Sequence, residues 1–294
     1  MDLKAQSQWG WGVAVYLFLV AVGTGAYVVG VLADFRGPEW QTLAHIGIFL
    51  SFPCCAVAGF VKLAQLGKPA VAWRAWMRPG TSWIARGTLL LFSFMLVSFI
   101  HLLLNLFGDG GVYHFLGIVG AVLAVSLMLY SGILLTAARP IAFWSTALLP
   151  ILFLLSALVC GMMAIVLLGV IGGEPFEGPL GKLQQAVVAF LVLKALAILI
   201  YLQSTHRVGV ARASVRMVLR GELAPLFWFG VVVAGLVLST LFGALAVSAS
   251  SAALAAIAAV FGLAGGLAIR QVVLGAGIHA PLRAGSFEVP LPIV

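Results

Sequence analysis

The chain has 294 residues, of which 63% are hydrophobic and only 8% are charged, and its net charge is +8. Soluble domains contain about 25% charged residues, so this composition excludes a protein that exposes its whole surface to water. The basic residues lie between long apolar runs and form no basic domain. Their charge therefore indicates membrane topology, and no nucleic-acid partner is expected.

Apolar runs of about 20 residues, each long enough to cross roughly 30 Å of hydrocarbon, follow one another along the chain. The first run is too long for a signal-peptide core, so it is kept as a span. Hydropathy predicts eight spans, at residues 12–33, 43–66, 82–107, 113–137, 142–171, 183–204, 226–248 and 252–275. Thr81 or Ser82 is suited to cap the third span. The expected fold class is an all-α integral membrane protein with eight transmembrane helices.

The basic residues sort to one side of this topology. With eight spans, both termini share a face with the loops that follow the second, fourth and sixth spans. That face receives thirteen basic residues: Lys4, Lys62, Lys68, Arg74, Arg78, Arg86, Arg139, Arg207, Arg212, Arg216, Arg220, Arg270 and Arg283. The opposite face receives only Arg36 and Lys182, beside Asp34, Glu39, Asp109, Glu174 and Glu177. The positive-inside rule then predicts that both termini are cytoplasmic.

A weak internal repeat suggests two four-helix bundles. Residues 74–78 and 216–220 each begin and end with arginine, lie in the same loop of their half, and lead to a tryptophan-containing helix start. Two similar bundles would explain this, and so would the ordinary accumulation of arginine in cytoplasmic loops. The expected division is a first bundle over residues 1–137 and a second over 138–294, which includes a cytoplasmic C-terminal tail.

Polar residues from the first four spans are expected at one depth, near the outer surface. Polar groups inside a bilayer are costly, so those that persist are candidates for function. The topology places seven of them there: Tyr27, Asp34, His45, His101, Asn105, Tyr113 and His114. A quinone needs a donor for each carbonyl oxygen, a titratable group for protons and apolar walls for its tail. We therefore expect a quinone pocket in which His101 and His45 are catalytic and the other five residues bind the ring.

Two alternatives stay open for these residues. Tyr27, Tyr113 and His114 are also typical of an aromatic belt at the headgroup level. His45 and His101 are also suited to axial ligation of a haem b, although transmembrane cytochromes often carry two histidine pairs. Here His206 and His279 fall in a loop and in the tail, so no second pair is expected.

Lys194 is the remaining basic residue and lies near the middle of the sixth span. A buried lysine readily loses its charge, so Lys194 is a candidate proton relay. A side chain that reaches toward the interface or binds a neighbouring helix is the alternative. Cys54, Cys55 and Cys160 lie inside apolar segments without metal-chelating spacing, so no metal site or iron–sulfur cluster is expected in the chain.

The loop after the second span carries the most specific motif. Between Pro69 and Pro79, a short helix would place Trp73 and Trp76 at the membrane interface. The loop reads Leu-Gly-Lys-Pro at 66–69 and Pro-Gly-Thr-Ser-Trp-Ile-Ala-Arg-Gly at 79–87. Residues 11–25, 221–230 and 265–277 add glycine-rich matches. With these segments the chain resembles the NrfD/polysulfide reductase membrane-subunit family.

The resemblance implies a haem-free, quinone-reactive anchor in the cytoplasmic (inner) membrane of a bacterium or archaeon. Menaquinone or ubiquinone would be its bound substrate. Its implied partners are a ferredoxin-like iron–sulfur subunit on the outer face and a molybdopterin catalytic subunit. The family motifs transfer no quinone contacts to particular residues, so the candidate site rests on depth and chemistry. A membrane transporter and a passive anchor are the competing classes of function.

Overall fold

The computed structural model describes residues 9–65, 80, 82–107, 111–137, 141–206, 209, 211–278, 282–284 and 287–289. Within them, eight helices are long and apolar enough to cross a membrane, as predicted. The spans are α1 (Trp11–Asp34), α2 (Gln41–Ala64), α3 (Trp83–Phe107), α4 (Gly111–Thr136), α5 (Leu148–Ile171), α6 (Gly181–His206), η4 with α8, and α9 (Ala252–Gly275). The seventh span begins as a π-helix, η4 (Leu226–Leu238), and continues as α8 (Ser239–Ser248). At about 1.5 Å per residue, helices of this length cross the hydrocarbon layer.

Shorter elements connect the spans or follow them. The one-turn helix η1 (Pro38–Trp40) leads into α2, and the π-helical turn η3 (Phe176–Leu180) leads into α6. A surface helix, α7 (Ala211–Arg220), lies between α6 and η4. After α9, β1 (Leu282–Ala284) and β2 (Phe287–Val289) form an antiparallel pair.

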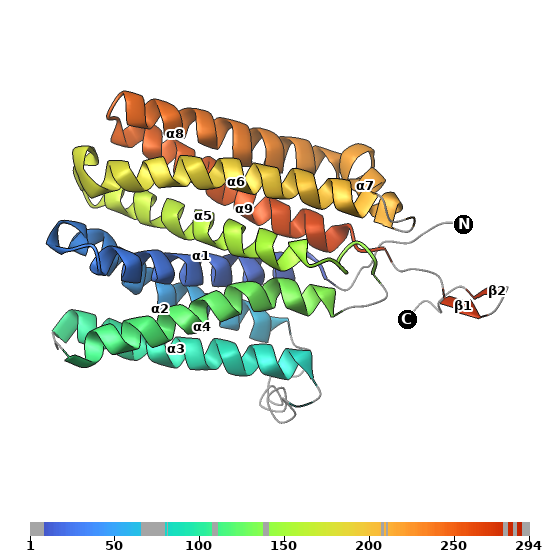
Figure 1. Cartoon of the computed structure of the whole chain (residues 1–294), viewed down its shortest axis with the longest axis horizontal. Coiled ribbons are helices and arrows are strands. Elements are labelled where there is room, and N and C mark those ends of the chain that lie inside the picture. Colours follow the sequence, from blue (N-terminus) through green and yellow to red (C-terminus); the bar gives the residue numbers. More distant parts are fainter. Residues whose placement is uncertain are drawn as a thin grey trace.

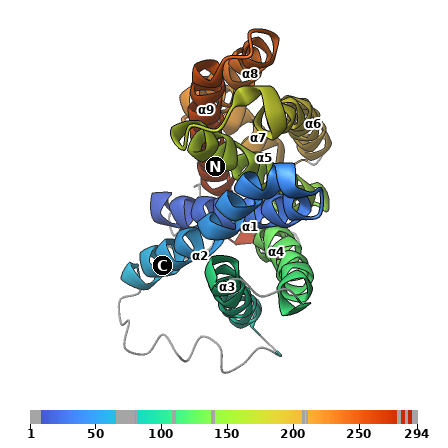
Figure 2. The same ribbon diagram turned by 90° about the vertical axis from the view of Figure 1, so that its left-hand side faces the viewer.

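The helices α1 and α5 lie at the centre of the molecule (Figures 1 and 2). The helices α2, α3 and α4 lie on one side of this pair, and α6, α8 and α9 lie on the other. We call the end at which α1 begins and α9 finishes the terminal end, and the opposite end the distal end. The distal end carries the connections α1–α2, α3–α4, α5–α6 and α8–α9 (Figure 1). Whether residues 1–137 and 138–294 are separate bundles stays a prediction.

Glycines allow α1 and α5 to approach closely. A Cβ added to Gly25 would meet the backbone carbonyl of Ala157, and one added to Gly161 would meet the backbone of Gly25 and Ala26. Small residues at such crossings let helix backbones pack together in a membrane, where apolar surface alone drives no association. The central contact between the two sides therefore depends on these two glycines.

Two elements differ from the sequence prediction. The fifth span begins at Leu148 and not at residue 142, because residues 141–147 form turns in which Trp144 Nε1 donates to the Val273 carbonyl (2.7 Å). The helix α7 occupies what was predicted to be a loop.

At the third span, Ser82 Oγ accepts from the Ala85 amide (3.3 Å), which confirms Ser82 as a cap. The predicted helix between Pro69 and Pro79 lies outside the described residues.

Candidate functional site

A pocket of about 410 Å³ opens at the distal end, where α1 and α3 finish and α2 and α4 begin. It is lined by Asp34, Gly37, Pro38, Gln41, His45, Leu104, Asn105, Tyr113 and His114. Each of the first four spans contributes to this lining, and so does the turn between α1 and α2. The volume lies within the range of about 300–1,000 Å³ that is typical of small-molecule sites.

The turn between α1 and α2 shapes one wall of the pocket. Gly37 has a φ of 117°, a backbone conformation that side chains disfavour, and Pro38 follows at the start of η1. This sharp reversal brings Asp34, at the end of α1, near His45 in the first turns of α2. The local sequence Gly-Pro therefore places a carboxylate and an imidazole on the same pocket.

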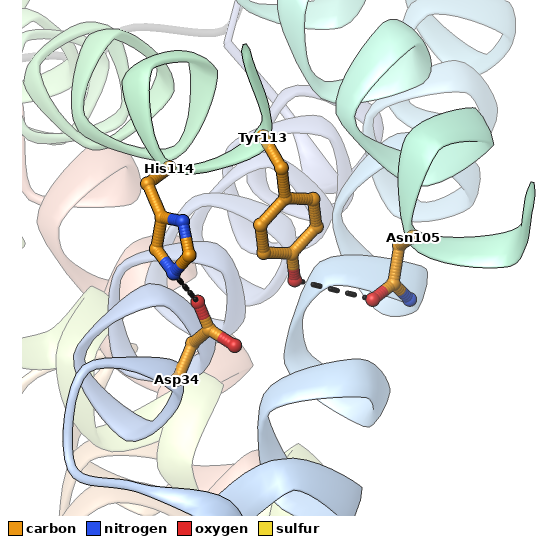
Figure 3. A network of polar contacts seen from close by, with 4 residues as sticks. All are labelled: Asp34, Asn105, Tyr113 and His114. Carbon is orange, nitrogen blue, oxygen red and sulfur yellow. Dashed lines mark hydrogen bonds and ion pairs between the residues drawn. The ribbon is translucent and has the colours of Figure 1, made fainter. Parts of the chain in front are cut away.

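Two polar contacts cross the pocket (Figure 3). His114 Nε2 lies 3.5 Å from Asp34 Oδ2, and this pair joins the start of α4 to the end of α1. The Tyr113 hydroxyl donates to Asn105 Oδ1 (3.2 Å), which joins α4 to α3. The His114 side chain is about half exposed, whereas the Asp34 carboxylate is largely covered. A protonated His114 would therefore have a counter-charge that is partly shielded from solvent.

A buried layer lies behind the pocket. The Tyr27 hydroxyl lies 2.7 Å from His101 Nδ1 and 3.3 Å from the Leu116 carbonyl oxygen, and both side chains are at most 1% exposed. The ring of His101 lies against the ring of Tyr113, with centroids 4.4 Å apart. Tyr27 and His101 are thus linked to the pocket through Tyr113.

His101 retains one unused ring nitrogen. Its Nε2 is buried and has no hydrogen-bond partner among the described residues. It faces Gly117 of α4, where an added Cβ would lie 3.7 Å away. With Nδ1 engaged by Tyr27, either neutral tautomer leaves Nε2 unpaired as a donor or an acceptor. A buried polar atom without a partner costs about 1–3 kcal/mol, so His101 Nε2 is a candidate for a functional contact.

The structure brings the sequence-predicted residues of the first four spans together in two layers. Asp34, His45, Asn105, Tyr113 and His114 line the pocket, whereas Tyr27 and His101 lie behind it. Full burial excludes the aromatic-belt interpretation for Tyr27. Sequence reasoning missed Gln41, one turn before His45 on α2, and the Gly37–Pro38 turn. The Gly-Pro dipeptide between two spans was the available signal for that turn.

Lys194 lies apart from this pocket, in a second buried polar region. Its Nζ is buried and has no hydrogen-bond partner among the described residues. Arg270, which charge sorting assigned to the cytoplasmic face, is also buried, with 1% exposure. Its Nη1 donates to Ser156 Oγ (3.2 Å) and to the Gly266 carbonyl, and its guanidinium lies over Phe18 and Phe153. Sequence reasoning missed Arg270 because it lies near the end of its span.

Two comparisons with known proteins bear on the family of the chain. A search of curated proteins for similar sequences returned no match. The family model for polysulphide reductase, NrfD, matches residues 2–281, which is nearly the whole chain. With eight membrane-spanning helices and this match, the chain belongs to the polysulphide reductase NrfD family, whose members are membrane subunits of electron-transferring complexes.

Proposed function

We propose that the chain is the haem-free, quinone-reactive membrane subunit of a molybdopterin and iron–sulfur oxidoreductase. The observation that carries this proposal is the distal pocket of about 410 Å³, in which two histidines, a tyrosine, an asparagine and a carboxylate surround one space. Menaquinone or ubiquinone is the substrate class that this chemistry fits. Family membership supports the same conclusion, since NrfD proteins belong to redox complexes.

Different parts of the pocket suit different parts of a quinone. His45, Tyr113 and His114 supply polar hydrogens or ring nitrogens for the two ring oxygens. Leu104 supplies an apolar wall, and Phe107 and Phe115, which are 82% and 64% exposed, extend the apolar surface along α3 and α4 toward lipid. An isoprenoid tail would follow this surface into the bilayer while the ring stays among the polar groups.

Quinol oxidation releases two protons and two electrons, and the pocket accounts for the protons. We assign His114 as the first proton acceptor, because its Nε2 lies 3.5 Å from the Asp34 carboxylate and its exposed side allows release to solvent. His101 acts behind Tyr113 as a positioning residue that orients Tyr27 and Tyr113. His45, which also lines the pocket, is the second catalytic residue.

The electrons pass to a partner, since the chain is proposed to hold no redox centre of its own. Among the described residues of the helices and their connections, apart from the buried Arg270, the terminal end carries five basic residues and one acidic residue: Lys62, Arg86, Arg212, Arg216, Arg220 and Glu222. The distal end carries two basic and four acidic residues: Arg36, Lys182, Asp34, Glu39, Glu174 and Glu177. By the positive-inside rule, the terminal end is cytoplasmic and the distal pocket faces outward. A ferredoxin-like subunit on the distal end, with the molybdopterin subunit attached to it, would bring an iron–sulfur cluster close to the quinone.

Binding of a short-chain quinone analogue to the purified subunit tests the proposal. His45→Phe removes a polar group and fills part of the pocket, so the dissociation constant should rise about 5- to 150-fold, as expected from the loss of about 1–3 kcal/mol. His206→Phe makes the same change at the exposed end of α6, at the terminal end, and should leave affinity unchanged. Equal binding by wild type and the His45 variant would contradict the proposed site, and absence of any binding would favour a passive anchor.

Lys194 is proposed as a proton relay on the other side of the molecule. Its buried Nζ has no hydrogen-bond partner among the described residues, so a relay through it requires water to carry the proton to and from the amine, and its burial is costly. Lys194→Met should therefore stabilise the folded protein by about 1–3 kcal/mol while it slows proton-coupled turnover. Thermal unfolding and proton release per quinol oxidised measure the two effects. Unchanged rate and stoichiometry of proton release would leave Lys194 a purely structural role.

A further inference from the structure

The surface helix α7 carries its arginines on one face. Arg212, Arg216 and Arg220 recur every four residues and are all exposed. The opposite face of the helix, with Ala211, Ser214, Val215 and Val218, is buried against the bundle. Residues four apart in an α-helix lie on the same side, about 6 Å apart along the axis. The three arginines therefore form one row on the exposed face of the helix.

Exposed tryptophans place this row at the membrane surface. Trp11, Trp83 and Trp228 stand at or near the first residues of α1, α3 and η4, all at the terminal end, and are 52%, 42% and 47% exposed. Tryptophans in such positions mark the headgroup level of a bilayer. Trp228 Nε1 donates to the Leu219 carbonyl in the last turn of α7 (3.1 Å), which ties the helix to this level.

No ion pair is found for the arginine row in the described part of the chain, where the nearest carboxylate in the sequence is the exposed Glu222. The ion pairs found there join His114 to Asp34 and Lys182 to Glu39, both at the distal end. Arg212 Nε donates to the His206 carbonyl (3.3 Å), which orients that side chain but leaves its charge unbalanced. An exposed row of positive charges at the headgroup level is complementary to anionic phosphates.

We propose that Arg212, Arg216 and Arg220 form a binding site for acidic phospholipid headgroups. Guanidinium groups bind phosphate oxygens in a bidentate manner, and the buried face of α7 holds all three arginines at the terminal end of the bundle. A lipid fits better than an acidic protein, because α7 joins two membrane spans and lies beside the tryptophan level, where headgroups are always present. The bound lipids would hold the α6–η4 connection against the membrane surface.

Native mass spectrometry of the detergent-purified full chain tests this site. The protein is titrated with phosphatidylglycerol, with phosphatidylcholine and with inorganic phosphate. The wild type should bind phosphatidylglycerol in preference to phosphatidylcholine. A triple variant, Arg212→Gln with Arg216→Gln and Arg220→Gln, should lose about tenfold or more of that affinity, because each basic residue near the surface contributes to binding.

Two further variants make the outcome decisive. Arg36→Gln with Lys182→Gln removes exposed positive charge at the distal end and should bind phosphatidylglycerol like the wild type. Replacing the three arginines by lysine keeps the charge but removes the bidentate contacts, so its affinity should lie between those of the wild type and the glutamine variant. This partial retention also separates charge loss from misfolding. Equal binding of both lipids, or full affinity in the glutamine variant, would overturn the proposal. Displacement of the lipid by equimolar inorganic phosphate would overturn it too, in favour of a soluble anion.

Discussion

Replacing His101 by alanine is expected to lower the turnover number for quinol oxidation by the whole complex about tenfold or more. His101 does not line the pocket, so the effect must pass through its neighbours. The Tyr27 hydroxyl would lose the partner that lies 2.7 Å away, and the Tyr113 ring would lose the imidazole packed against it. Tyr113 would then be free to shift within the pocket. Steady-state kinetics with the assembled complex measures the change.

Rescue and a matched control separate a specific role of His101 from general damage. His101→Gln retains an acceptor that can reach the Tyr27 hydroxyl and should recover part of the turnover number. Ser98→Ala alters a buried residue one turn earlier on α3, whose hydroxyl donates to the Met95 carbonyl of the same helix, and should leave turnover unchanged. Co-purification of the partner subunits checks assembly. Full activity in the alanine variant, or equal losses at Ser98 and His101, would remove His101 from the proposed mechanism.

Hydropathy predicted the spans because a bilayer allows few backbone structures. Every backbone polar group within it must be satisfied internally, so long apolar runs become helices whatever their detailed sequence. Outside the apolar layer this constraint disappears. There, local contacts decide the structure, such as the Trp144 bond to Val273 that precedes α5 and the apolar face that holds α7. Hydropathy carries no information on either contact.

The candidate site was predictable in depth but not in layering. Counting residues from the span ends placed His101 and Asn105 near the same surface, and both lie at the distal end as expected. They are one helical turn apart, which is about 6 Å along the axis. This displacement along α3 leaves Asn105 in the pocket and His101 behind it, because the Tyr113 ring from α4 packs against the imidazole. Packing between α3 and α4, which no single-helix pattern reports, determines this order.

Arg270 shows the limit of charge sorting. A basic residue near the end of a span is ordinarily assigned to the adjacent loop. The Arg270 side chain instead points into the protein, where Ser156, Gly266 and two phenylalanine rings surround it. The sequence contains no acidic residue between Glu177 and Glu222 or between Glu222 and Glu288. No carboxylate in α6, the seventh span or α9 was therefore present to signal a buried charge.

Substituting valine for Gly161 is expected to destabilise the protein more than any change in the pocket. The new side chain would overlap the backbone of Gly25 and Ala26, and a backbone cannot move aside as a flexible side chain can. Ordinary overpacking costs about 1–3 kcal/mol, and here α1 and α5 must separate along their crossing, so the loss should reach at least the upper end of that range. Thermal unfolding followed by size-exclusion chromatography in detergent measures it.

Gly59→Val is the matched control, because an added Cβ at that position of α2 meets nothing within 4 Å. It should leave the unfolding temperature near that of the wild type. Equal destabilisation by both variants would show that the loss does not come from the α1–α5 contact.

The Gly161 variant also tests the division at residue 137. All pocket residues lie on α1 to α4 or on the turn between α1 and α2. If residues 1–137 form a bundle of their own, the folded fraction of the Gly161 variant should bind a quinone analogue with wild-type affinity. A loss of affinity that parallels the loss of stability would mean that α5 is part of the support of the pocket.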